Sequence, residues 1–119
     1  MKILLICLGG SLGALSRYYL AEALNKFTVI NIPVGILGVN FIGCLILGLL
    51  INYLDPKFEN IYNPLLFVGF LGAFTTFSAF SKETINLLSS GNLVLASTYI
   101  FLTVFSCLVG TWVGMLISK

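Results

Sequence analysis

Long apolar runs dominate the chain, and short polar stretches separate them. A helix needs about 20 mostly apolar residues to cross a bilayer, and four windows meet that length, at residues 3–24, 33–53, 62–89 and 93–117. The windows are joined by short stretches, at 25–32, 54–61 and 90–92. Short connections favour antiparallel neighbours. The pattern therefore predicts one all-α membrane domain over residues 1–119, with four transmembrane helices.

The third window is too long for a simple span. Its 28 residues would form a helix of about 42 Å, whereas the hydrocarbon core is about 30 Å thick. Residues 69–81 hold two glycines and four hydroxyl side chains among four phenylalanines. Irregular backbone at membrane depth is tolerated only where protein buries it or where it lines a cavity. We predict a third helix broken near its middle, as at known ion sites; the alternative is one long, tilted helix.

Composition supports the membrane class and excludes others. Hydrophobic residues make up 59% of the chain and charged residues only 8%, against about 25% charged in a soluble domain. The net charge of +2 and the lack of a basic run predict no nucleic-acid binding. The chain has no histidine, and its cysteines (Cys7, Cys44 and Cys107) lack metal-ligand spacing. We therefore predict that the protein is not an enzyme.

The distribution of lysines gives only a weak orientation signal. Three lysines fall on one side of the predicted bundle and two on the other: Lys2, Lys57 and Lys119 against Lys26 and Lys82. Orientation in the membrane follows such biases, so a weak one permits insertion in both directions. Identical chains could then pair antiparallel.

Two G-x-x-x-G pairs could bring helices close together. These are Gly9 with Gly13, and Gly110 with Gly114. They serve either packing within one chain or a subunit interface. Four thin spans can hardly enclose a pore alone, and this favours an oligomer.

Polar side chains inside the spans are the candidate functional groups. Arg17 either snorkels to the surface or makes an aqueous vestibule electropositive, which would concentrate anions. Asn40 lies midway through the second span, where its amide either joins helices or donates N–H groups to a passing anion. No carboxylate lies deep in any span, because Glu22 is close to a helix end.

The third span combines hydroxyl groups with aromatic rings. Its hydroxyl donors are Thr75, Thr76, Ser78 and Ser81, and Phe74, Phe77 and Phe80 recur at three-residue spacing near one helical face. Ring edges carry positive partial charge, so edges beside hydroxyls could hold a small anion. Ser106 and Thr111 of the fourth span either continue this polar track or bond back to their own helix.

Three segments resemble the CrcB/Fluc family of fluoride channels, in order and one per span. Residues 9–18 read GGSLGALSRY, similar to the family's G-G-x-x-G-A-x-x-R-Y. Residues 33–43 read PVGILGVNFIG, similar to G-T-L-x-V-N-x-x-G, and residues 69–83 read GFLGAFTTFSAFSKE, similar to G-x-x-G-x-x-T-T-F-S-T-F-S-x-E. The resemblance covers nearly the whole chain.

The resemblance implies a fluoride-selective channel in the plasma membrane that lets fluoride leave the cell passively and so limits its toxicity. It implies a dual-topology, antiparallel dimer with two pores. It also implies a structural sodium ion held by backbone carbonyls that map to Gly72 and Thr75. The pore residues map to Asn40, Phe77 and Phe80, and the vestibule arginine to Arg17.

Two departures from the family pattern each remove a hydroxyl near the implied pore. Ile36 stands where the family usually has threonine, and Ala79 follows Ser78 where a threonine is usual. They keep open a non-conducting subunit that pairs with a divergent paralogue, beside the homodimer. A proton-coupled exporter of the small multidrug resistance type is a further alternative. It would need a buried glutamate in the first span, where this chain offers only Glu22.

Overall fold

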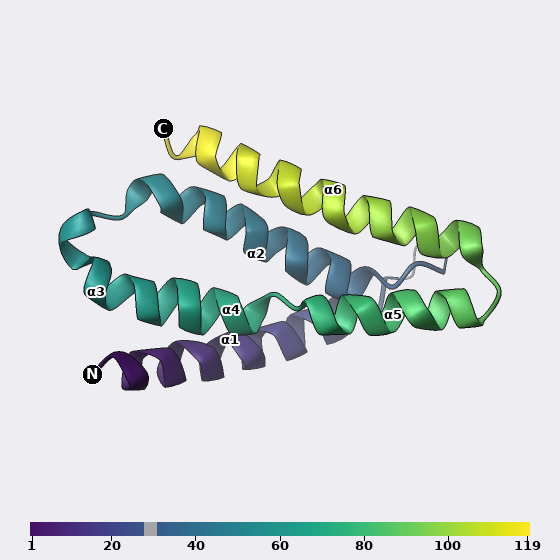
Figure 1. Cartoon of the computed structure of the whole chain (residues 1–119), viewed down its shortest axis with the longest axis horizontal. Coiled ribbons are helices and arrows are strands. Elements are labelled where there is room, and N and C mark those ends of the chain that lie inside the picture. The colour runs from purple at the N-terminus through teal and green to yellow at the C-terminus, as the bar shows by residue number, and fades with distance from the viewer. Residues whose placement is uncertain (28–30) are drawn as a thin grey trace.

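A computed structural model describes residues 1–27 and 31–119, and this part of the chain is helical almost throughout (Figure 1). Within it, four helices are long and apolar enough to cross a membrane. They are α1 (Lys2–Leu24), α2 (Val34–Tyr53), a composite third span (Pro56–Ser89) and α6 (Leu93–Ile117). The predicted all-α class with four spans is confirmed. The predicted connection 25–32 includes residues 28–30, so that part lies outside the described residues.

The third span is built from five consecutive pieces. They are a 3-10 turn η1 (Pro56–Phe58), α3 (Glu59–Tyr62), a π-helical segment η2 (Asn63–Leu71), α4 (Gly72–Phe74) and α5 (Phe77–Ser89). The span begins at Pro56 rather than at residue 62, because Asp55 caps it: its carboxylate accepts a hydrogen bond of 2.9 Å from the Lys57 N–H. Proline is also tolerated in the first turn, where its missing N–H is not needed.

The predicted break in the third helix is confirmed, and two residues form it. Thr75 has φ −76° and ψ 150°, and Thr76 has φ −147° and ψ 115°, so both are extended. The chain runs on in nearly the same direction, with α4 and α5 on either side of a short extended link (Figure 1). Phe74 therefore ends one helix and Phe77 begins the next. The prediction that these two rings lie on one helical face is wrong.

The glycine pairs act within one chain. α1 packs mainly on η2, and α2 mainly on α6. A Cβ atom on Gly13 would overlap the Phe70 carbonyl, and one on Gly114 would lie 2.5 Å from the Leu45 carbonyl oxygen. Of the two interpretations of these pairs, the geometry therefore shows packing within the subunit.

The chain forms a thin slab with little interior. It measures 51 × 30 × 21 Å, and its shortest dimension accommodates only two layers of helices of about 10 Å diameter. Large apolar side chains are exposed along α1, the third span and α6, for example Leu12, Val68 and Trp112. Both termini lie at the same end of the slab (Figure 1). The apolar surface shows that most of this slab faces lipid or another protein surface.

Candidate functional site

The break in the third span is held by the side chain of Asn40. The Thr76 N–H donates to Asn40 Oδ1 at 2.8 Å, and Asn40 Nδ2 donates to the Thr76 carbonyl at 3.1 Å. Asn40 is only 7% exposed, as is Thr76, so the backbone groups freed by the break would otherwise be buried without partners. The amide joins α2 to the third span, as one interpretation held. The second N–H of the same amide remains as a donor.

Thr76 also starts the second half of the span. Its Oγ1 accepts a hydrogen bond of 3.2 Å from the Ala79 N–H, which makes Thr76 the N-cap of α5. The same hydroxyl lies 3.1 Å from Ser78 Oγ. An N-cap hydroxyl satisfies a donor that the first helical turn leaves unpaired. Thr76 and Ser78, both predicted site residues, therefore form one hydroxyl cluster at the break.

These bonds release two backbone carbonyls from helical pairing. In a continuous helix, Gly72 would accept from the Thr76 N–H and Thr75 from the Ala79 N–H. Here those donors are used by Asn40 and by the Thr76 hydroxyl. Gly72 and Thr75 line a surface pocket of about 230 Å³, beside Gly43 and Cys44 of α2. These are the two residues predicted to offer carbonyls to a sodium ion, and oxygen ligands suit a hard cation.

The two predicted pore phenylalanines lie together but differ in exposure. The Phe77 and Phe80 ring centroids are 5.2 Å apart. Phe80 is 7% exposed, whereas Phe77 is 76% exposed on the outer surface of the slab. Phe74, on the other side of the break, is buried and stacks on Phe70 instead. Of the aromatic pair at the start of α5, Phe80 therefore lies in the interior of the chain and Phe77 on its surface.

Sequence reasoning missed two buried residues of α6, and one of them packs against Phe80. The Tyr99 ring is fully buried 5.5 Å from Phe80, and its hydroxyl donates to the Glu83 carboxylate. Thr103, one turn further along, is 4% exposed, and within the described residues its Oγ1 has no hydrogen-bond partner. Gly110 and Gly114 already marked the buried stripe of α6. Thr103 lies seven residues before Gly110 on this stripe, and Tyr99 lies four residues before Thr103.

The two hydroxyls predicted on α6 lie beside this stripe. Ser106 donates to the Thr103 carbonyl and Thr111 to the Cys107 carbonyl, each at 3.2 Å. Thr111 lies at the close contact with Gly48, eight residues beyond Asn40 along α2. Both hydroxyls therefore bond back to their own helix.

The predicted vestibule arginine lies in a separate pocket. Arg17 is half-buried and lines a pocket of about 380 Å³ with Glu22, Asn25 and Ile36. Among the described residues no ion pair ties its guanidinium to a carboxylate. A guanidinium without an ionic partner raises the concentration of anions around it. Ile36, where the resemblance leads one to expect threonine, forms part of this wall.

The chain is similar to one family of known proteins. Residues 4–115 match the family model described as CrcB-like protein, Camphor Resistance (CrcB). Relatives called Fluoride-specific ion channel FluC include one from Flavobacterium psychrophilum, 40% identical over 98% of this chain and 96% of the relative. One from Campylobacter jejuni is 42% identical over 98% of this chain and 97% of the relative. One from Coxiella burnetii is 36% identical over all of this chain and 98% of the relative.

These matches extend over nearly the whole chain. They include all four spans and the break between Phe74 and Phe77. The protein is thus a multi-pass membrane protein, and it belongs to the CrcB family.

Proposed function

We propose that the protein is a fluoride channel through which fluoride leaves the cell passively. The observation that carries this proposal is the close match to relatives named as fluoride-specific ion channels, over nearly the full length of both chains. A channel in the plasma membrane would drain fluoride that enters the cell as the neutral acid. Its substrate is then a small, strongly hydrated anion that must find hydrogen-bond donors inside the membrane.

Groups at the break and on α6 can supply such donors. Asn40 keeps one N–H after bonding Thr76, and Thr103 has a buried hydroxyl free of protein partners within the described chain. Phe77 and Phe80 offer ring edges beside the Thr76–Ser78 hydroxyl cluster. Weak donors of several kinds suit conduction, because an ion must enter a site and also leave it.

The function requires two chains, and we propose an antiparallel dimer. A slab 21 Å thick has no room for a pore between helices of about 10 Å diameter. Phe77 points out of the chain and is 76% exposed, so it is placed to meet a second copy. Impermeant thiol labelling in intact cells tests the arrangement. A Lys119→Cys variant without the three native cysteines should be labelled in about half of the chains before lysis, as dual insertion requires.

The same dimer would hold a sodium ion. The carbonyls of Gly72 and Thr75, released from helical pairing, would supply oxygen ligands for a hard cation, and a two-fold partner would double their number. One chain alone offers too few oxygens for a closed site. Replacing sodium by a large organic cation should destabilise the dimer in detergent, and unchanged dimer lifetimes would contradict this part of the proposal.

A proton-coupled exporter is not favoured. Glu22, which that alternative needs in a buried position, is exposed near the end of α1. A non-conducting partner subunit differs from the channel in a single measurable respect, because it would not transport fluoride when present alone.

The decisive test is fluoride efflux from liposomes that contain only this chain. We expect fast fluoride efflux, no chloride efflux, and loss of fluoride efflux in the Asn40→Asp and Phe80→Ile variants. If the purified chain alone gave no fluoride efflux, and a divergent paralogue added to it produced efflux, the chain would be assigned to a heterodimer. Equal rates for chloride and fluoride would contradict the proposal.

A further inference from the structure

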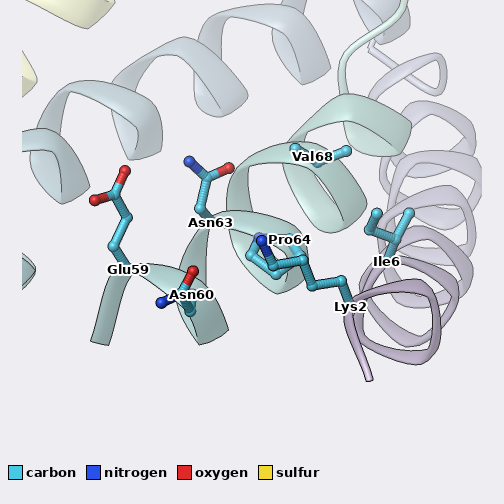
Figure 2. Close-up of a pocket in the computed structure, with 7 residues that line it drawn as sticks. All are labelled: Lys2, Ile6, Glu59, Asn60, Asn63, Pro64 and Val68. Carbon is cyan, nitrogen blue, oxygen red and sulfur yellow. The ribbon is translucent and has the colours of Figure 1, made fainter. Parts of the chain in front are cut away.

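Figure 2 shows a pocket of about 400 Å³, which opens at the end of the molecule that carries the N-terminus (Figure 1). It lies between the start of α1 and the beginning of the third span. Lys2 reaches in from the α1 side, the Glu59 carboxylate stands at the opposite side, and Asn60 and Asn63 lie between them (Figure 2). Both contributing spans begin here, which would put the pocket near the membrane surface.

The polar groups of this pocket have no partners within the described chain. The side chains of Lys2, Glu59, Asn60 and Asn63 make no hydrogen bond or ion pair there, although a cation and an anion line the same pocket. The separation of Lys2 from Glu59 leaves room for a ligand that contacts both. Such a ligand would itself carry a negative and a positive group.

The walls change from polar to apolar with depth into the membrane. On α1, Lys2 is followed one turn deeper by Ile6, and on the third span Asn60 is followed by Pro64 and Val68. Val68 is 54% exposed. Charged residues therefore line one end of the pocket, and apolar residues line the other. A phospholipid has the same arrangement, with a polar headgroup at one end and acyl chains at the other.

We propose that this pocket binds a phospholipid with a phosphoethanolamine headgroup. Lys2 and the two asparagine amides donate to the phosphate, and Glu59 accepts from the primary ammonium. A quaternary choline carries no N–H donor for Glu59, so the pocket should prefer ethanolamine to choline. A purely anionic headgroup would leave Glu59 facing like charge.

Native mass spectrometry of the whole protein in mild detergent tests this. Dioleoyl phosphatidylethanolamine, phosphatidylcholine and phosphatidylglycerol are offered in equal amounts. We expect ethanolamine lipid to be retained about threefold more than choline lipid, because a solvent-exposed ion pair contributes modestly. Two variants test the two parts of the headgroup separately. Glu59→Gln should abolish the preference for ethanolamine over choline. Lys2→Gln should reduce retention of both zwitterionic lipids and leave that preference unchanged.

Matched controls come from the same end of the molecule. Lys57→Gln and Asp55→Asn remove a cation and an anion outside the pocket, and asparagine retains the capping role of Asp55. Both should behave as the unsubstituted protein. Equal retention of the two zwitterionic lipids, a preference that survives Glu59→Gln, or stronger retention of phosphatidylglycerol would each overturn the proposal. So would an Asn60→Cys variant that cross-links two chains through this pocket.

Discussion

The two halves of the third span are held in place by different means. η2 lies directly against α1, with backbone touching backbone at glycines: a Cβ on Gly9 would overlap the Leu65 carbonyl, and one on Gly69 would lie 2.9 Å from the Ile6 carbonyl oxygen. α5 instead contacts α6 through side chains, with Phe80 against the buried Tyr99 ring. The first half is fixed by shape alone, and the second by specific polar and aromatic groups.

This difference indicates that the η2–α1 contact has a structural role, whereas the groups at the break have a functional role as well. The contact between α1 and η2 at Gly9, Gly13 and Gly69 is here called the glycine seam. It has no side chain that could move or bind an ion, so it sets only the spacing of the helices. The junction between the halves carries Asn40, Thr76 and the released carbonyls of Gly72 and Thr75. Substitutions in the seam should therefore cost folding, and substitutions at the junction should cost function as well.

The largest effect is expected in the seam. Gly13→Val would force a side chain into the Phe70 backbone, and we expect it to destabilise the fold by about 3 kcal/mol or more. Gly10→Ala is the matched control, because its Cβ would meet nothing closer than the Gly69 carbonyl oxygen at 4.0 Å. Thermal unfolding in detergent, together with the yield of monodisperse protein, measures both. A well-folded Gly13→Val protein would show that η2 is not fixed by this contact.

The next effect is expected at the junction. Asn40→Leu leaves the buried N–H and C=O of Thr76 without partners, and each costs about 1–3 kcal/mol. Asn52→Leu is the control on the same helix, since its amide makes one exposed bond to the Met115 carbonyl. Fluoride efflux should vanish in Asn40→Leu and persist in Asn52→Leu. If the two variants unfold at the same temperature, Asn40 does not hold the break.

Sequence alone was sufficient for the number of spans and for the break, because apolar length and the glycine- and hydroxyl-rich middle of the third span are local signals. The start of that span at Pro56 was missed, since the cap formed by Asp55 lies in a polar stretch that looks like a loop. Thr103 and Tyr99 were missed because all hydroxyl-bearing residues of α6 look alike in the sequence. Only the structure shows that Tyr99 and Thr103 lie on the buried face of this helix. The double bond of Asn40 to Thr76 depends on long-range geometry that spacing cannot encode.

A smaller effect is expected at the cap of α5. Thr76→Val removes the oxygen that accepts from the Ala79 N–H, and we expect a loss of about 1 kcal/mol. Thr76→Ser keeps that oxygen and should behave like the unsubstituted protein. Hydrogen exchange at the Ala79 amide distinguishes local from global loosening. Unaltered exchange in Thr76→Val would show that α5 begins without help from this hydroxyl.

The smallest effect on stability is expected at Thr103. Its hydroxyl is buried and has no partner in the described chain, so Thr103→Val should change the free energy of unfolding by less than about 1 kcal/mol, and in the stabilising direction. Thr84→Val is the matched control, because the Thr84 hydroxyl donates to the Phe80 carbonyl at 2.8 Å and its loss should destabilise. Thermal unfolding compares the two variants, and liposome efflux supplies the second readout. Slower fluoride efflux from a Thr103→Val protein of undiminished stability would mean that this hydroxyl is kept for the ion. Unchanged efflux would place the conduction path on the Phe77 side of α5, away from α6.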